Sequence, residues 1–478
     1  MLFNSLHYLA FLPIVLIGYY LMSDRHRWAW LLAASCYFYA VFIPAYLLVL
    51  GGMIAVDYVA GRLIEPATGH RRRALLLMSI VANVAVLAVF KYYDFLNENL
   101  HALLASLGWS YSTRPLGLLL PVGLSFHTFQ AMSYTIEVYR GTQKAERHFG
   151  IYALYVMFFP QLVAGPIERP QNMLHQFRER HAVLYRNFAD GFVLIAWGMF
   201  KKVAVADRLS AYVAGVYDTG HDARALPATL ATFFFAFQIY CDFSGYSDIA
   251  IGSAQLFGVR LMTNFRRPYF ARSVADFWTR WHISLSTWFR DYVYIPLGGN
   301  RVDARRWVRN LLLTFLLSGL WHGANWTYVV WGLLNGVYVA LSATTIEFRR
   351  RIITAIGLAR VPRVHRALQV AATFTLISLT WVFFRADSAT TAVRMLGNMI
   401  GSWHWVDVRA VSGGDVPLSL ALIGIVIGAE ACMGDAKVSD YLAERRRGVR
   451  WVAAYGICML TLLVGVFSSQ QAFIYFQF

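Results

Sequence analysis

Residues 311–331 read LLLTFLLSGLWHGANWTYVVW, an apolar run with one ionisable residue, His322, near its middle. A membrane-spanning helix needs about 20 mostly apolar residues. An ionisable side chain at that depth is costly, so it either links two helices by hydrogen bonding or has a functional role. The small residues Gly319, Gly323 and Ala324 beside it allow another backbone or a ligand to approach closely.

The composition of the whole chain is that of a membrane protein. Its 478 residues are 58% hydrophobic and 14% charged, whereas soluble proteins carry about 25% charged residues. Apolar stretches recur from end to end without a long polar segment that could fold separately. The sequence therefore predicts an all-α polytopic membrane protein with a single integral-membrane domain, 1–478. The segments long enough to enter the bilayer are 6–22, 28–43, 45–60, 74–93, 116–138, 150–166, 188–206, 227–257, 310–344, 367–384, 416–433 and 451–467.

The formal charge of +17 is concentrated in short loops between apolar runs. This distribution follows the positive-inside rule, which favours the lipid bilayer over nucleic acid as the partner. It places the basic loops around 71–73, 266–309, 349–366 and 445–450 in the cytoplasm. Residues 6–22 are then a retained first helix with an external N-terminus, and the chain after 467 is external too.

Both flanks of residues 310–344 are basic, so the run must enter the membrane and return on the same side. We expect two short helices or a re-entrant hairpin with His322 toward the turn. Non-spanning backbone at membrane depth is tolerated only inside protein or along a cavity. His322 should therefore face an internal cavity.

Residues 276–299, DFWTRWHISLSTWFRDYVYIPLGG, contain a second histidine, His282. Placed on one helix, the aromatic residues occupy one half and most polar residues the other, with His282 at the edge of the aromatic half and one turn before Ser286. The pattern predicts an amphipathic helix along the membrane interface. Such a helix could also wall an entrance and present His282 inward.

Polar residues also interrupt the apolar run 227–257, where Asp242, Ser244 and Asp248 stand close together. The run is too long for one straight crossing, so we expect a break here that lines the same cavity. For Asp57, His127 and Glu168, structural hydrogen bonding to a neighbouring helix is favoured over a functional role.

The chain lacks phosphate-binding glycine loops, HExxH and GxSxG. Two histidines are too few to indicate a metal site. Ser318 lies one turn before His322, so a Ser–His pair is conceivable, although Gly319 favours tight packing for Ser318. Burial disfavours a charged imidazolium. A neutral His322 suits general-base activation of a hydroxyl that attacks an activated acyl group.

The chain resembles the membrane-bound O-acyltransferases, and among them the bacterial alginate O-acetyltransferase group. The resemblance rests on an ordered set of motifs: PQLVAGPIERP at 160–170, QIYCDFSGYSDIAIG at 238–252, NFRRPYF at 264–270, DFWTRWHISLSTWFRDYVYIPLGGNR at 276–301, SGLWHGANWTYVVWGLLNG at 318–336 and FIYFQF at the end. It implies about 11–12 spanning or re-entrant helices around a funnel, with interfacial helices beside them.

The resemblance also implies roles for both histidines. The family's essential histidine corresponds to His322, and the second motif position corresponds to His282, for which we expect orientation of the donor or acceptor. Further substrate-binding candidates from these motifs are Asp242, Ser244, Trp278, Arg280, Trp281, Ser286, Asp291, Ser318, Trp321 and Asn325.

The implied reaction moves acetyl groups, from acetyl-CoA or an acyl carrier in the cytosol, toward an extracytoplasmic polysaccharide. It implies a bacterial inner membrane, periplasmic acetyltransferase partner proteins, no tightly bound cofactor and no metal. Alginate is the first expectation for the acceptor. Cellulose, peptidoglycan or teichoic acid are alternatives, and a transporter or flippase is the alternative from another class. A passive scaffold would leave both histidines replaceable.

Overall fold

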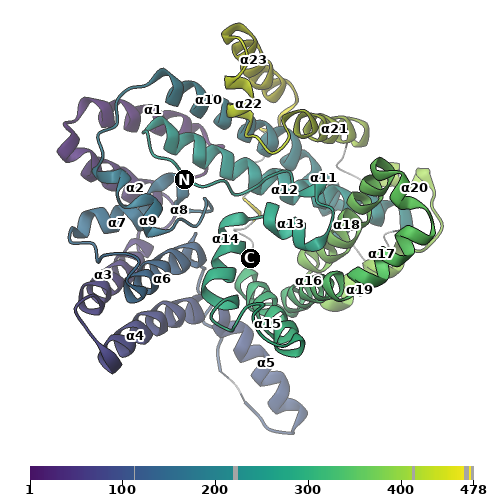
Figure 1. Ribbon diagram of the computed structural model, residues 1–478, viewed down its shortest axis with the longest axis horizontal. Coiled ribbons are helices and arrows are strands. Elements are labelled where there is room, and N and C mark those ends of the chain that lie inside the picture. Colours follow the sequence, from purple (N-terminus) through teal and green to yellow (C-terminus); the bar gives the residue numbers. More distant parts are fainter. Residues whose placement is uncertain (112, 219–223, 412–414, 468–472, 475–478) are drawn as a thin grey trace. The chain divides into compact units, whose positions relative to one another are not determined.

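The computed structural model describes residues 1–111, 113–218, 224–411, 415–467 and 473–474, which form helices and no strand (Figure 1). In this part of the chain, seven helices are long and apolar enough to cross a membrane. They are α3 (Tyr46–Ile64), the continuous helix Gly69–Ser106, α12 (Ala225–Leu256), α16 (Trp326–Thr344), α18 (Pro362–Arg385), α21 (Val416–Met433) and α23 (Arg447–Val464). The prediction of an all-α polytopic membrane protein is confirmed.

The first compact unit comprises residues 1–195 and 246–262. Its remaining helices are α1 (Leu6–Leu21), α2 (Arg27–Ala40), α6 (Leu124–Arg140), α7 (Phe149–Met157), α8 (Phe159–Leu162), α9 (Pro170–Met173) and most of α10 (Tyr185–Met199). The helix Gly69–Ser106 contains α4 (Gly69–Leu87), a π-helical segment and α5 (Tyr93–Ser106). Helix α6 is buried along most of its length and packs against α3 and α4.

Buried polar residues in this unit are held by neighbouring helices. The carboxylate of Asp57 accepts hydrogen bonds from Ser79 Oγ (2.6 Å) and Asn83 Nδ2 (2.9 Å) on α4. The Glu168 carboxylate accepts one from the backbone N–H of Met262. A buried polar group without a partner costs free energy, so these bonds are required for packing. The structural interpretation is confirmed for Asp57.

The second unit comprises residues 196–245 and 263–474. Besides the helices named above, it contains α11 (Asp207–Tyr217), α13 (Val274–Arg280), α14 (Ile283–Phe289), α15 (Ala304–His322), α17 (Ile346–Ala355), α19 (Ala389–Asn398), α20 (Trp405–Ala410) and α22 (Val438–Ala443). Helix α15 packs along α16, and α16 packs against α18. The three helices carry most of the residues that surround His322.

A helical hairpin is present as predicted, with His322 as the last residue of α15 and a three-residue turn before α16. Its helices have 19 residues each, so they are longer than the expected short helices, and α16 is long enough to cross a membrane. Glycines let the two helices approach closely. A Cβ at Gly319 would collide with the carbonyl oxygen of Tyr328, and one at Gly332 would collide with that of Phe315. Glycine costs about 1 kcal/mol in a helix interior, and here this cost allows the backbone contact that closes the hairpin.

Helix α12 is unbroken over Ala225–Leu256, so the expected break at Asp242–Asp248 is wrong. The polar residues are satisfied by neighbours instead. Lys202 Nζ lies 2.5 Å from Asp242 Oδ1, and Lys201 Nζ donates to Ser244 Oγ at 2.9 Å. Because these side chains find partners on the preceding π-helical segment Phe200–Ala206, the backbone of α12 does not need to open.

The sequence pattern also predicts one helix from Asp276 to a turn at 296–300. The turn is present, but the single helix is wrong. Helix α13 ends at Arg280, α14 starts at Ile283, and a π-helical segment follows at Arg290–Tyr294. Other boundaries differ less: the segment expected at 116–138 is helical from Leu124, and that expected at 150–166 forms the short helices α7 and α8.

Candidate functional site

His322 is buried at the carboxyl end of α15, where it is 4% exposed. Aromatic rings surround it: the ring centroids of Trp331 on α16 and Phe384 on α18 lie 4.8 Å and 5.5 Å from that of the imidazole. Its Nδ1 lies 2.7 Å from the backbone carbonyl oxygen of Ser318, one turn earlier.

This hydrogen bond decides the tautomer of His322. A carbonyl oxygen can only accept, so Nδ1 must carry the hydrogen. In the neutral imidazole, Nε2 then has the lone pair and can accept a proton. The arrangement provides what a general base needs without a side-chain carboxylate on Nδ1.

His282 lies in the break between α13 and α14 and adopts a left-handed backbone conformation with φ of 43°. Few residues other than glycine adopt this conformation, although asparagine, aspartate and histidine do so more often than the rest. The ring is 1% exposed. It packs on Phe243 with 4.5 Å between ring centroids and lies 6.2 Å from Trp321. Burial lowers the pKa of His282 well below its usual value of 6.5, and nearby His322 lowers it further.

The break between α13 and α14 is stabilised by hydrogen bonds with Asn264 and Arg266, which precede α13 in the chain. The N–H of Ile283 donates to the carbonyl oxygen of Asn264 (2.9 Å), and the N–H of Arg266 donates to that of Arg280 (2.9 Å). The Asn264 side-chain oxygen also accepts from the N–H (3.2 Å) and hydroxyl (2.9 Å) of Ser284. These bonds satisfy the N–H groups of Ile283 and Ser284 at the start of α14 and fix the backbone of His282.

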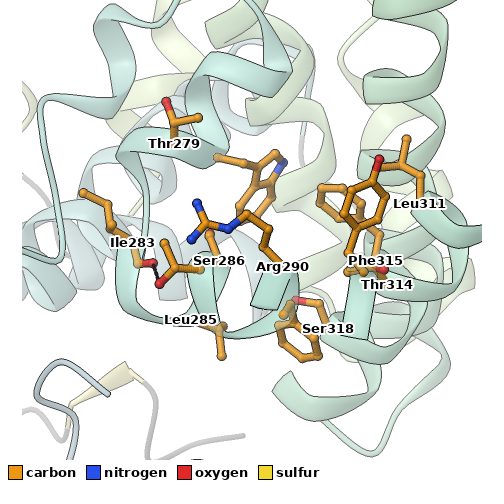
Figure 2. Close-up of a pocket in the computed structure, with 13 residues that line it drawn as sticks. Thr279, Ile283, Leu285, Ser286, Arg290, Leu311, Thr314, Phe315 and Ser318 are labelled. Atoms are coloured by element: carbon orange, nitrogen blue, oxygen red, sulfur yellow. Dashed lines mark hydrogen bonds between the residues drawn. The ribbon is translucent and has the colours of Figure 1, made fainter. Parts of the chain in front are cut away.

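A cavity of about 330 Å³ lies between α13, α14, the segment Arg290–Tyr294 and α15. Figure 2 shows Ile283, Ser286 and Arg290 on one side and Phe315 and Ser318 on the other. Seven of its thirteen lining residues carry a hydroxyl or guanidinium group, and the others are aliphatic or aromatic. Such a mixture of apolar walls and polar groups is common for small-molecule sites. The residues that line this cavity do not include His322 or His282, so the expectation that His322 faces an internal cavity stays a prediction. The link between the cavity and His322 is Ser318, which lines the cavity and whose carbonyl oxygen accepts the hydrogen bond from His322.

The structure brings some predicted site residues to this cavity and engages others elsewhere. Trp278, Ser286 and Ser318 line the cavity, and Trp321 packs between the two histidines. The other predicted residues have structural contacts: Trp281 packs in an aromatic cluster, Arg280 pairs with Asp276 and Asp435, Asp291 pairs with Arg290, Asp242 pairs with Lys202, Ser244 accepts from Lys201, and Asn325 caps α16. Their roles in substrate binding remain predictions.

A buried charge cluster near His282 was not predicted. Lys202 Nζ lies 2.8 Å from Asp207 Oδ1 as well as beside Asp242. The backbone N–H of Ile474 donates to Asp242 Oδ2 at 2.8 Å, and Phe473 packs on Phe243 with 5.6 Å between ring centroids. The rest of the closing FIYFQF motif lies outside the described residues. Within the described chain, no three His, Cys, Asp or Glu side chains are grouped to hold a metal ion.

Comparison with known proteins identifies the family. Residues 148–385 match the model of the membrane-bound O-acyltransferase family. The chain is 40% identical over 410 residues to a probable alginate O-acetylase of Pseudomonas aeruginosa, covering 85% of this chain and 76% of that protein. This chain belongs to the membrane-bound O-acyltransferase family. It is also 32% identical over 533 residues to a peptidoglycan O-acetyltransferase of Helicobacter pylori, covering 100% and 98%.

Family membership confirms the prediction of a multi-pass membrane acyltransferase. It does not support the transporter and scaffold alternatives. A more distant relative is a teichoic acid D-alanyltransferase of Bacillus subtilis, 28% identical over 235 residues, or 47% of this chain and 59% of that protein. The matched family region contains both histidines, the cavity and Asn264.

Proposed function

We propose that this acyltransferase takes acetyl groups from acetyl-CoA on the cytosolic side of a bacterial inner membrane. The observation that carries the proposal is a buried imidazole whose Nδ1 is fixed on the carbonyl oxygen of Ser318, a residue that lines the cavity. In this arrangement, Nε2 of His322 takes the proton of an attacking hydroxyl. The hydroxyl oxygen then bonds to the thioester carbonyl carbon, the C–S bond breaks, and the CoA thiolate takes the proton back from the imidazolium.

Charge around the cavity supports a nucleotide-bearing donor. The exposed arginines Arg301, Arg305, Arg306 and Arg309 stand in the loop and first turns leading into α15, which lines the cavity from Leu311 to Ser318. Arginine binds phosphate groups through several N–H donors at once. A phosphopantetheine chain is narrow, so it suits the cavity while the phosphates stay among the arginines. A carrier protein with the same prosthetic group has the same chemistry.

For the acceptor we propose an extracytoplasmic polysaccharide of the alginate type, reached with the help of periplasmic acetyltransferase proteins. The similarity to alginate O-acetylases supports this choice. Peptidoglycan is the second candidate, because the relative named for that polymer matches along the whole chain. The positive-inside pattern supports a periplasmic position for both chain termini.

The test uses the purified full-length protein with acetyl-CoA labelled in the acetyl group. We expect release of free CoA thiol together with labelled acetyl esters on a hydroxyl acceptor. A folded preparation that releases no CoA thiol from acetyl-CoA, but frees the phosphopantetheine thiol of an acetylated carrier protein, contradicts the proposed donor. In cells lacking the protein, loss of ester-linked acetate from exopolysaccharide supports the first acceptor, and loss from peptidoglycan alone overturns it.

A further inference from the structure

Three tryptophans, Trp278, Trp331 and Trp381, contact one another in sequence, and the first of them lines the cavity. Trp278 on α13 lines the cavity and contacts Trp331 on α16, with 5.7 Å between ring centroids. Trp331 contacts the imidazole of His322 at 4.8 Å. Trp381 on α18 stacks on Trp331 at 5.8 Å with an interplanar angle of 21°. Trp331 is therefore the indole that contacts both the proposed base and a residue of the cavity wall.

The indole N–H groups of these three tryptophans are buried, and within the described chain none has a hydrogen-bond acceptor. Trp331 and Trp381 are each 1% exposed. Buried tryptophan N–H groups usually find an acceptor. Leaving one without a partner costs about 1–3 kcal/mol. The Trp331 N–H lies in a ring that contacts the proposed base, His322. We therefore expect the bound substrate to supply its acceptor.

Acyl transfer supplies such an acceptor. When a hydroxyl oxygen attacks the thioester, the carbonyl π electrons move onto the carbonyl oxygen, which becomes negatively charged until the C–S bond breaks. A fixed N–H donor at that oxygen stabilises the transition state more than the substrate. The effect is large where water is excluded, as it is around the buried rings of Trp331 and His322.

We propose that Trp331 is a catalytic residue whose Nε1–H donates a hydrogen bond to the carbonyl oxygen of the acyl donor as negative charge develops there. His322 Nε2 holds the proton taken from the hydroxyl, and returns it to the departing thiolate. No other reactant is needed: a thioester and an alcohol give an ester and a thiol. The inference rests on the proposed function, because it requires an acyl thioester at His322.

The competing explanation for Trp331 is packing. Its ring meets that of Trp278 edge-on, at an interplanar angle of 77°, and an indole N–H can point at an aromatic face as a weak donor. In that case the N–H has no role in the reaction. Removing it would then change stability slightly and leave the rate of acyl transfer unchanged.

Two replacements of Trp331 remove the N–H. The first is Trp331→Phe. The second is β-(3-benzothienyl)alanine at position 331, which keeps the bicyclic shape and puts sulfur in place of the N–H. We expect kcat to fall about 10²–10³-fold, the usual effect of losing one such donor, and KM for the acyl donor to rise by no more than about 10-fold. The matched control is the benzothienyl replacement of Trp381, whose N–H is also buried without an acceptor among the described residues; its kcat should stay close to that of the unaltered protein.

Binding of two inert donor analogues gives a second readout. A ketone analogue of acetyl-CoA, with methylene in place of sulfur, keeps the carbonyl oxygen, whereas S-ethyl-CoA lacks it. Loss of the Trp331 N–H should weaken the ketone analogue about 3- to 10-fold and leave S-ethyl-CoA unaffected. Equal effects on both analogues, or an unchanged kcat in the benzothienyl protein, overturn the proposal. If the unaltered protein itself does not turn over acetyl-CoA, the proposed donor is wrong, and the same comparison with an acetylated carrier protein still tests Trp331.

Discussion

Replacing His322 by alanine is expected to lower the rate of acyl transfer about 10²–10⁴-fold, the usual contribution of a general base. Without the imidazole, no group at the end of α15 can take the proton of the attacking hydroxyl. The Ser318 carbonyl oxygen remains on the helix but can only accept hydrogen bonds. The measurement is CoA release and acetyl-ester formation by purified protein, with insertion and abundance determined in the same cells.

His322→Gln and His127→Gln sharpen this comparison. Glutamine at position 322 keeps polarity and much of the volume but is not a base, so it should be as inactive as alanine. His127 is another buried histidine, in the first unit, and its replacement should leave the rate within a few-fold of normal. Acetylation retained by either His322 variant removes this residue from the chemistry.

The second large effect is expected at His282. We predict that His282→Ala lowers the transfer rate about 10- to 100-fold, because it removes a ring that packs between Phe243 and Trp321 beside the reacting groups. His282→Asn should retain more activity and more stability, since asparagine tolerates the left-handed backbone required there.

Asn264→Ala leaves the imidazole in place but removes the acceptor that holds Ser284. It should reproduce part of the His282→Ala effect.

The same variants give a defined pH dependence of stability. Burial lowers the pKa of His282 in the folded protein, so the ring stays neutral there while the unfolded chain binds a proton below about 6.5. The unfolded state then binds more protons, and stability falls as the pH drops below 6.5. The thermal stability of the unaltered protein should therefore decrease more between pH 7 and pH 5 than that of His282→Asn. Parallel curves for the two proteins would contradict this assignment.

The hairpin at His322 could be predicted because its determinants are local. Basic residues flank both ends of 310–344, and glycines occur where the two helices touch. The break at His282 could not be predicted in this way, because the amphipathic pattern continues through it. The break depends on backbone hydrogen bonds that the Asn264 carbonyl oxygen accepts and the Arg266 N–H donates, and both residues are distant in sequence. Sequence spacing within residues 276–299 does not contain that information.

For the polar residues of α12 the sequence predicts a break, whereas the structure has a continuous helix. A cluster with Asp242 and Ser244 in an apolar run is compatible with a broken helix or with partners on another segment, and the partners are Lys202 and Lys201. Asn264 and Trp331 were missed among the site residues although both lie in the quoted motifs. Neither carries a charge, and their importance comes from the backbone and the rings they contact.

The most direct test of the central claim is an experimental structure of the full-length protein with the ketone analogue of acetyl-CoA bound. The pantetheine chain should occupy the cavity between α14 and α15. The analogue's carbonyl carbon should lie within about 6 Å of His322 Nε2, which leaves room for one hydroxyl oxygen about 3 Å from each. An analogue bound elsewhere, or an imidazole of His322 that faces lipid with no passage leading to it, would contradict the role of His322 as the base.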